Sequence, residues 1–184
     1  MQVLKTRVEG LLLIEPDVYR DERGYFFEHY SRAKYEALGL IGEFVQDNCS
    51  LSQRGTIRGL HYQIDPGAQG KLTSVVHGRV LDVAVDVRFG SPTFGQYVAV
   101  ELSEENHVQF WIPPGFAHGF SVLSETVVFM YKCTSYYSKE HERSIRFDDP
   151  DLAIDWRVTD PIVSEKDLAA PYLRSIGKDG LSSW

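Results

Sequence analysis

The segment RVLDVAVDVR, residues 79–88, carries the clearest strand pattern in the chain. Its side chains alternate between an apolar and a mostly polar series: Leu81, Val83, Val85 and Val87 against Asp82, Ala84, Asp86 and Arg88. Successive side chains of a strand point to opposite faces of a sheet, so this alternation predicts a strand with one apolar face.

Short segments of the same character recur along the chain, rich in β-branched and aromatic residues and separated by Gly, Pro, Asn and Ser. They are residues 10–16, 24–30, 43–51, 56–64, 71–78, 96–103, 108–114, 119–124 and 126–134. This spacing is typical of a sandwich or barrel. The sequence therefore predicts an all-β fold, an antiparallel β-sandwich forming a single domain over residues 1–184.

Helical patterns are scarce and short. Residues 31–39 fit a helix with Ser31 as N-cap and Gly39 just past its end. A second helix is expected to begin at SEKDLAA, where Ser164 and Asp167 have the spacing of a capping box. We expect both helices at the periphery of the sandwich and a loosely ordered tail from about residue 172.

Bulk properties exclude several classes of protein. The 184 residues carry a net charge of −7, so no global positive field would attract nucleic acid or anionic lipid. No apolar run approaches the ~20 residues of a membrane span, and the first residues do not resemble a signal peptide. Cys49 and Cys133 are far apart and lack metal-ligand spacing, which favours reduced thiols. We expect a soluble cytoplasmic protein.

The segment IRGLHYQIDPGAQGKL, residues 57–72, places cationic or near-cationic side chains among core-like residues. Arg58 and His61 are three apart, so on an unbroken strand they would face opposite ways. A bulge at Gly59 would turn both toward one cavity, near Lys71 in sequence. The alternative is a surface arginine beside a hydrogen-bonded core histidine, which this segment alone favours.

A second histidine, His118, lies in FWIPPGFAHGF, residues 110–120, where two prolines and a glycine constrain the backbone. Zinc or iron needs three or four ligands, and neither His61 nor His118 has another histidine at ligand spacing. We therefore predict no metal and no cofactor. A histidine base needs no metal when a carboxylate orients it.

Two further segments have both a structural and a functional interpretation. In VVFMYKCTSYYS, residues 127–138, Val127, Phe129 and Tyr131 share one strand face. This is either an aromatic sheet face or a face that presents Tyr131 as a proton donor, with a later tyrosine available for stacking. In DERGYFFEHY, residues 21–30, Arg23 lies in a turn, either solvated or directed at a phosphate.

Several separated motifs occur in a fixed order: DERGYF (21–26), FVQDN (44–48), RGLHYQ (58–63), QGKL (69–72), DVAVDVR (82–88), SPTFG (91–95), WIPPGFAHGF (111–120), YKCT (131–134) and SEKD (164–167). Together they resemble the dTDP-4-dehydrorhamnose 3,5-epimerase family, and the resemblance spans nearly the whole chain. It implies a cupin-like β-sandwich or jelly roll without the usual cupin metal. It also implies a homodimer whose N-terminal segment reaches the neighbouring site.

The family's substrate resembles dTDP-4-dehydro-6-deoxy-D-glucose, and its product is the L-rhamno ketone of rhamnose synthesis. By resemblance His61 matches the base, Asp167 its carboxylate partner, Lys71 the group that stabilises the enolate, and Tyr131 the proton donor. The matching substrate-binding residues are Arg23, Glu28, Gln46, Asp47, Asn48, Arg58, Lys71, His118, Tyr137, Glu142 and Lys166.

The sequence leaves alternatives open. Asp167 satisfies the capping-box rule, so it either caps the second helix or pairs with His61. Epimerisation at one carbon only is a close rival to the double reaction. A cupin ketoisomerase, a non-catalytic sugar-nucleotide binding module and a plain structural sandwich are weaker alternatives, because His61, Lys71 and Tyr131 occur together.

Overall fold

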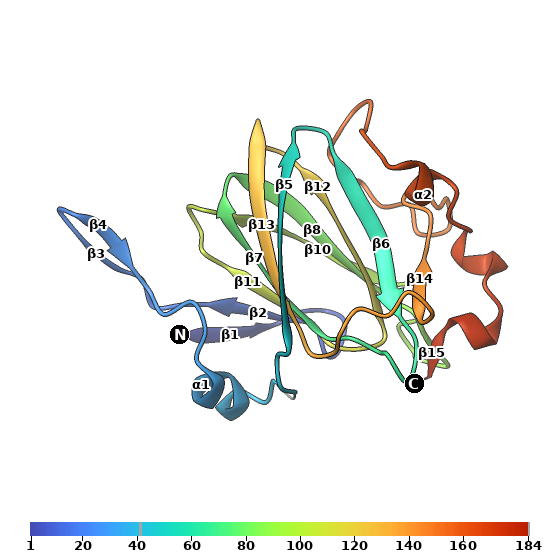
Figure 1. The fold of residues 1–184 in the computed structure, drawn as a ribbon, viewed down its shortest axis with the longest axis horizontal. Helices are drawn as coiled ribbons and strands as arrows, with labels where there is room; N and C mark the ends of the chain where they lie inside the picture. The colour runs from blue at the N-terminus through green and yellow to red at the C-terminus, as the bar shows by residue number, and fades with distance from the viewer. Residues whose placement is uncertain (41, 184) are drawn as a thin grey trace.

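The computed structural model describes residues 1–40 and 42–183 and consists mainly of two antiparallel sheets packed face to face (Figure 1). The six-stranded sheet has the order β1 (Gln2–Lys5), β2 (Leu12–Glu15), β11 (Gln109–Ile112), β7 (Lys71–His77), β13 (Thr126–Cys133), β5 (Gln46–Gln53). The five-stranded sheet has the order β10 (Tyr97–Ser103), β8 (Arg79–Asp86), β12 (Phe116–Val122), β6 (Ile57–Gln63), β14 (Glu142–Ser144). The predicted antiparallel sandwich is confirmed.

Smaller elements surround the two sheets. β3 (Tyr19–Asp21) and β4 (Gly24–Phe26) form a hairpin that projects away from the sandwich in Figure 1. β9 (Arg88–Phe89) pairs in parallel with β15 (Ser182–Ser183). The helices are α1 (Arg32–Ala37), α2 (Glu165–Leu168) and two 3₁₀ turns at Leu173–Ser175 and Lys178–Gly180. No helix among the described residues is long and apolar enough to cross a membrane.

Strand β8 has the predicted alternation, but its apolar face points out of the sandwich. Leu81, Val83, Val85 and Val87 belong to a buried cluster with Trp156 and other residues from the C-terminal third of the chain. The opposite face carries Val80, Asp82, Ala84 and Asp86 and lies against the six-stranded sheet. A sheet can have both faces buried when another segment covers its outer side.

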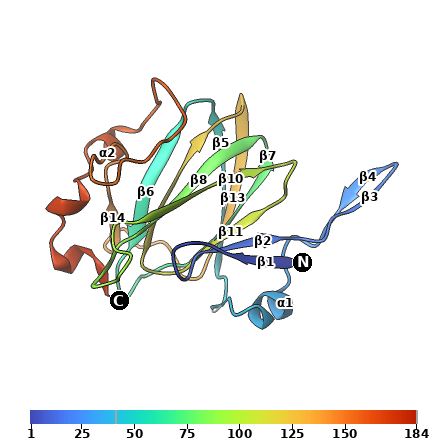
Figure 2. The same cartoon turned by 180° about the vertical axis from the view of Figure 1, so that it is seen from behind.

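The C-terminal segment supplies that cover and is itself held in place. Figures 1 and 2 place the chain from α2 to the C terminus along the β6 side of the five-stranded sheet. Leu173 is 7% exposed, and its backbone N–H donates to Asp149 at 2.7 Å. The Tyr62 hydroxyl donates to the Gly180 carbonyl at 2.6 Å. The tail is therefore packed rather than loosely ordered as expected. Its apolar residues are few, and the sequence pattern does not show which sheet face they cover.

The interior between the sheets combines apolar and polar residues. Phe110, Phe120 and Phe129 belong to its main apolar cluster. Buried polar side chains lie among them, including Lys71, Thr73, Asp82, Asp86 and His118. A buried polar group costs free energy unless it is hydrogen-bonded, so this composition indicates a site within the sandwich.

A matched pair of leucine substitutions tests whether the tail is packed. Leu173 is 7% exposed and Leu168 is 43% exposed. We expect Leu173→Ala to lower the free energy of unfolding by roughly 2–5 kcal/mol, as core leucine truncations do. Leu168→Ala is expected to cost less than about 1 kcal/mol. Urea denaturation at equal protein concentration measures both, and equal midpoints would contradict a packed tail.

Candidate active site

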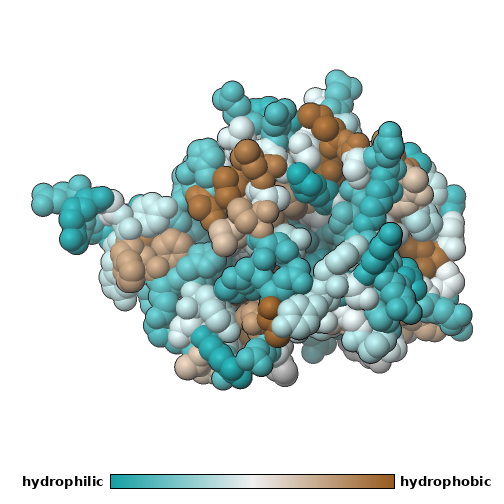
Figure 3. All heavy atoms as spheres, in the orientation of Figure 1, coloured by the Kyte–Doolittle hydropathy of each residue, from teal (hydrophilic) through white to brown (hydrophobic). Residues whose placement is uncertain are grey.

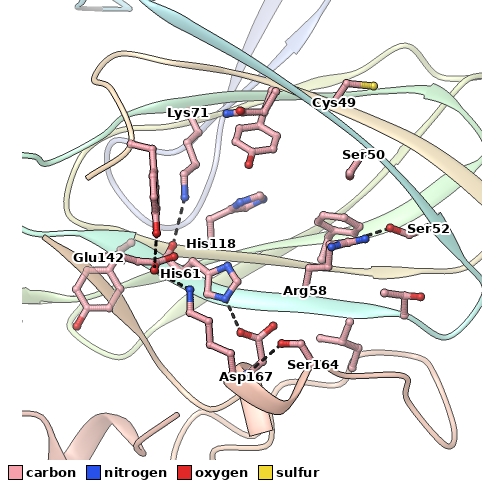
Figure 4. A pocket seen from close by; sticks show the side chains of 18 of the residues that line it. Cys49, Ser50, Ser52, Arg58, His61, Lys71, His118, Glu142, Ser164 and Asp167 are labelled. Atoms are coloured by element: carbon pink, nitrogen blue, oxygen red, sulfur yellow. Dashed lines mark hydrogen bonds and ion pairs between the residues drawn. The ribbon is translucent and has the colours of Figure 1, made fainter. Parts of the chain in front are cut away.

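A cavity of about 970 Å³ opens between β5 of one sheet and β6 of the other. This volume is within the range of small-molecule ligand sites. In Figure 3, which has the orientation of Figure 1, hydrophilic side chains surround the middle of the face on which the cavity opens. Residues from β5, β6, β7, β12, β13 and α2 line it (Figure 4).

The bulge predicted at Gly59 is confirmed, and it turns two side chains into the cavity. His118 of β12 pairs with His61, and Phe120 pairs with Arg58, so three steps on β6 oppose two on β12. The extra residue places Arg58 and His61 on the same face. A Cβ atom at Gly59 would lie 2.6 Å from Gly119 Cα, so only glycine permits this close approach.

His61 and Asp167 form the predicted pair. His61 Nε2 lies 2.5 Å from Asp167 Oδ1, and Asp167 also accepts from the Gly59 backbone N–H at 3.3 Å. The Ser164 hydroxyl caps α2 by accepting from the Asp167 backbone N–H, while the Asp167 carboxylate turns to His61. The capping role therefore falls to Ser164 and leaves the Asp167 side chain available for the site.

The hydrogen bond between the two side chains affects the ionisation of Asp167 and the orientation of the His61 ring. Burial alone would raise the pKa of Asp167, but the hydrogen bonds from His61 and Gly59 outweigh it and hold that pKa below its usual value. Asp167 is therefore a carboxylate, which can only accept hydrogen bonds. His61 Nε2 therefore donates to this carboxylate, and Nδ1 is the ring nitrogen that does not face it.

Lys71 is the first residue of β7, and its side chain lines the cavity. Its ammonium donates to the His61 carbonyl oxygen at 3.3 Å, and no carboxylate among the described residues forms an ion pair with it. Burial lowers the pKa of Lys71. A desolvated cation without a carboxylate partner stabilises a negative charge that develops beside it.

Tyr131 lies on the β13 face that it shares with Val127 and Phe129, as predicted. Its ring centroid is 6.4 Å from that of His118. Burial raises the pKa of the Tyr131 hydroxyl, which keeps it protonated at neutral pH. The residue thus has a proton that it can donate into the cavity.

Asp82 is a site residue that the sequence analysis did not single out. It is fully buried, and its Oδ1 lies 2.6 Å from His118 Nε2. Its other oxygen accepts from the Thr73 hydroxyl at 2.6 Å. Asp82 thus orients His118 as Asp167 orients His61. The available signal was the alternation of residues 79–88, which puts Asp82 on a face with Ala84 rather than with the valines.

Burial, only partly offset by Asp82, lowers the pKa of His118. The ring is therefore neutral at neutral pH, and its Nε2 proton is held by the carboxylate. Two histidines, each hydrogen-bonded to its own carboxylate, thus occupy opposing positions on β6 and β12.

Further polar side chains gather around Glu142, on the side of His61 away from Arg58 (Figure 4). The predicted residues Gln46, Asn48, Tyr137, Glu142 and Lys166 meet there. Gln46 accepts from the Tyr137 backbone N–H at 3.0 Å and donates to Asn48 at 3.1 Å. Glu142 accepts from Lys166 at 2.6 Å and from the Tyr137 hydroxyl at 3.1 Å. The Tyr137 side chain is thereby fixed while its ring stays exposed.

Arg58 lies on the opposite side of His61 from Glu142, next to Ser52 (Figure 4). Its Nε donates to the Ser52 hydroxyl at 2.9 Å, and no carboxylate among the described residues pairs with it. Most of its guanidinium donors remain available, and this planar group binds phosphate well.

Three predicted binding residues do not line this cavity. Asp47 lies on the opposite face of β5 from Gln46 and Asn48, where it pairs with Lys132 at 2.9 Å. Glu28 pairs with Lys34 at 2.9 Å outside the cavity. The cause for Asp47 is strand alternation, because consecutive residues of β5 cannot face the same side.

Arg23 lies at the turn of the β3–β4 hairpin, away from the cavity of its own chain (Figure 1). Its side chain is 85% exposed and pairs with Asp21 at 2.6 Å.

Within residues 1–40 and 42–183, no group of three or more His, Cys, Asp or Glu side chains could hold a metal ion. The donors that meet in the cavity are instead suited to proton transfer: a carboxylate-bound imidazole, a buried ammonium and a protonated phenol.

Comparisons with known proteins agree with this geometry. The family model for dTDP-4-dehydrorhamnose 3,5-epimerase matches residues 5–175. A dTDP-4-dehydrorhamnose 3,5-epimerase from Pseudomonas aeruginosa is 55% identical over 169 residues, covering 91% of this chain and 93% of the relative.

Solved structures show the same likeness. A 3,5-epimerase from Legionella pneumophila, in complex with dTDP-4-keto-L-rhamnose, has a TM-score of 0.96 and 53% identity, covering 100% of this chain and 98% of the other. A 3'-monoepimerase from Streptomyces bikiniensis, in complex with dTDP-quinovose, has a TM-score of 0.90 and 34% identity, covering 97% and 91% of the two chains. The chain belongs to the dTDP-4-dehydrorhamnose 3,5-epimerase family.

Proposed function

We propose that this protein converts dTDP-4-dehydro-6-deoxy-D-glucose into dTDP-4-dehydro-L-rhamnose by epimerisation at C3 and C5, in dTDP-L-rhamnose synthesis. The observation that carries the proposal is the His61–Asp167 pair in one cavity with Lys71 and Tyr131. Family membership supplies the substrate class, since two relatives with this name are 52% and 55% identical to the chain over 169 residues.

The reaction follows from the acidity of hydrogens next to a ketone. The C4 carbonyl acidifies the hydrogens on C3 and C5, and His61 Nδ1 removes one of them. The electron pair of the broken C–H bond moves onto the C4 oxygen as an enolate, which the Lys71 ammonium stabilises. Tyr131 then donates its proton to the same carbon from the opposite face, which inverts that centre. The enolate electron pair re-forms the C4 carbonyl, His61 releases its proton to solvent, and Tyr131 takes a proton up from solvent. The same steps at the other carbon then complete the reaction.

Each group is tuned for its step. Asp167 stabilises the imidazolium that forms when His61 takes a proton, because a carboxylate 2.5 Å away favours the charged ring. Lys71 has no carboxylate partner in the described chain, so its interaction strengthens as charge develops on the C4 oxygen. Asp82 and Thr73 fix the orientation of His118, which lines the sugar end of the cavity.

The part of the cavity around Tyr137 places the nucleotide base. The exposed ring of Tyr137 offers a platform on which thymine stacks. Arg58, next to Ser52 in the same cavity, offers its guanidinium donors to a phosphate. Gln46, Asn48 and Lys166 complete the base and ribose contacts. Asp47 and Glu28 lie outside the cavity of the single chain, as Arg23 does.

Epimerisation at a single carbon is the nearest alternative. The Streptomyces bikiniensis 3'-monoepimerase shares the fold at 34% identity, so the fold does not separate the two activities. The relatives named 3,5-epimerases reach 52–55% identity, which favours the double reaction. A binding module without catalysis is disfavoured, because a pure binder needs neither a base nor an acid.

The proposal includes a homodimer in which the β3–β4 hairpin enters the neighbouring cavity. The hairpin extends from the sandwich in Figure 1, and its residues Tyr19, Tyr25 and Phe26 are exposed in the single chain. Arg23, at the turn of the hairpin, does not line the cavity of its own chain. A second copy of the chain would bury these aromatic rings and receive Arg23 as a phosphate ligand. We place the enzyme in the cytoplasm, where Cys49 and Cys133 stay reduced.

Proton NMR of dTDP-4-dehydro-6-deoxy-D-glucose with the protein in deuterated water tests the function. We expect the H3 and H5 signals both to disappear as solvent deuterium replaces them. His61→Ala is expected to slow this exchange at least ~100-fold, the usual contribution of a general base, with dTDP affinity changed little. His77→Ala is the control, because His77 pairs with Glu104 away from the cavity. Loss of only one signal would contradict double epimerisation, and wild-type exchange in His61→Ala would remove His61 as base.

Tyr131→Phe tests the proton donor. The variant keeps the ring in the apolar cluster and removes only the hydroxyl. We expect product formation to fall by about 100-fold or more, while the first hydrogen exchange falls much less, because His61 still abstracts. Tyr136→Phe, at an exposed tyrosine outside the cavity, serves as control. Equal loss of exchange and product formation would argue against Tyr131 as the acid.

Subunit complementation tests the hairpin in trans. Arg23→Ala is expected to raise KM, and His61→Ala to abolish turnover. In a mixed dimer of the two variants, one cavity combines an intact His61 with the Arg23 of the other subunit. We expect that cavity to recover the wild-type KM in purified heterodimers carrying different affinity tags. Arg174→Ala replaces Arg23→Ala in the control, because Arg174 is a surface arginine paired with Asp151. Heterodimers that keep the high KM would show that Arg23 acts within its own chain.

A further inference from the structure

The β3–β4 hairpin has very few attachments to the sandwich that carries it. All six residues of its two strands are exposed. Among the described residues, hydrogen bonds and ring contacts join Tyr19–Phe26 to the rest of the chain only through Phe27, which adjoins β4, and His107. The direction of the hairpin therefore depends on very few groups.

His107 makes the contacts with the hairpin itself. Its ring centroid lies 4.6 Å from that of Tyr25 and 4.9 Å from that of Phe27. Arg20 Nη2 lies 3.3 Å from His107 Nε2, and the Arg20 guanidinium also lies over the Tyr25 ring at 5.4 Å. A guanidinium can only donate, so His107 Nε2 must be the acceptor of a neutral ring. Burial and the Arg20 charge lower the pKa of His107, which keeps that ring neutral.

Hydrogen bonds within the turn restrict the backbone that carries His107. Asn106 accepts from the backbone N–H groups of Ser103 and Val108, each at 3.0 Å. Ser103 accepts from Asn106 through its hydroxyl and from His107 through its carbonyl, both at 3.1 Å. His107 has φ +54°, in the left-handed region that side chains rarely adopt. Despite its position in a turn, His107 is only 6% exposed.

The ring contacts continue into the six-stranded sheet. The Phe27 ring lies 5.8 Å from that of His29, and His29 Nε2 lies 3.2 Å from the hydroxyl of Ser74 on β7. The His29 carbonyl accepts from the buried Gln109 amide at 2.8 Å. The segment that follows the hairpin is thus held on the sheet as far back as Phe27. His107 holds the hairpin itself.

We propose that His107 is a positioning residue for the β3–β4 hairpin, and that the rigid Ser103–Val108 turn sets through this ring where Arg23 reaches in the neighbouring cavity. The inference rests on the proposed entry of the hairpin into a second copy of the chain. His107 itself touches no substrate. It acts by restricting the directions that the hairpin samples, which lowers the ordering cost of each phosphate contact that Arg23 makes.

His107→Asn tests this role with the least disturbance of the turn. Asparagine accepts the left-handed conformation more readily than other side chains, so the backbone can stay as it is while the ring is removed. Phe27→Leu is the second variant, because it removes the other ring of the contact from a position with ordinary backbone. His77→Asn is the control, since His77 pairs with Glu104 and makes no contact with the hairpin.

Hydrogen exchange of the backbone amides of residues 19–26, followed by mass spectrometry on the intact dimer, reads the hairpin directly. We expect faster exchange in His107→Asn and Phe27→Leu but not in His77→Asn. KM is expected to rise about threefold to tenfold, the factor that the loss of one or two ring contacts gives, with kcat within about twofold because positioning affects binding and not chemistry. Unchanged exchange of residues 19–26 in both ring variants would overturn the proposal.

The double variant with Arg23→Ala separates this inference from the proposed function. If His107 acts through Arg23, adding His107→Asn to Arg23→Ala raises KM no further. If His107→Asn raises KM by the same factor in the wild type and in Arg23→Ala, His107 acts independently of Arg23. That result would overturn the inference. An unchanged KM in Arg23→Ala alone would instead contradict the hairpin contact in trans, while the exchange of residues 19–26 would still decide the anchoring role of His107.

Discussion

The close approach of Gly59 and Gly119 is the constraint on which the site depends. A Cβ at Gly59 would lie 2.6 Å from both Gly119 Cα and the His118 carbonyl oxygen, and a Cβ at Gly119 would lie 2.7 Å from the Arg58 carbonyl oxygen. Two adjacent strands without side chains at this point allow β6 to hold one extra residue. That extra residue puts Arg58 and His61 on one face. Without it, either the proposed phosphate ligand or the proposed base would leave the cavity.

The sequence was most informative where a local pattern decides the local structure. The alternation of residues 79–88, the bulge at Gly59 and the shared face of Val127, Phe129 and Tyr131 are all present as predicted. Which face of a strand is inward depends on what the rest of the chain covers. The valine face of β8 is buried by residues 145–181, so the Asp82 face could turn inward. Local pattern carries no information about that cover.

The same limit explains the site residues that the sequence misplaced or missed. Asp47 adjoins Gln46 in a family motif, but strand alternation separates neighbours that a motif groups together. Asp82 reads as an outward polar residue until its hydrogen bonds with His118 and Thr73 are known. Arg23 is present in the expected turn, but in the single chain it pairs with Asp21 away from the cavity, and its proposed target lies in a second copy of the chain. Local sequence patterns do not show which residues of distant strands, or of different subunits, come into contact.

A polar interior is costly for a sandwich of this size, and the arrangement shows how the cost is limited. Asp82, Asp86 and Asp167 are each hydrogen-bonded by at least two donors, so none is an unpaired buried charge. Lys71 is the exception, since it has only a backbone carbonyl as a hydrogen-bond acceptor. A group that is poorly compensated in the free protein gains most when an anion forms beside it. Lys71, with a single backbone acceptor for its ammonium, is thus well placed to stabilise the proposed enolate.

The two tasks of the site fall on structurally different parts of the chain. His61, Lys71, His118 and Tyr131 project from β6, β7, β12 and β13, strands paired on both sides within the two sheets. Proton transfer needs groups held within a fraction of an ångström, and paired strands provide that. Tyr137, Lys166 and Arg23 come from a loop, a four-residue helix and a projecting hairpin. Nucleotide binding tolerates more motion, but each mobile ligand lowers affinity by the entropy of fixing it. Small anchors such as the Gln46 contact to the Tyr137 backbone and the His107 ring under the hairpin therefore matter for binding, although they lie outside the chemistry.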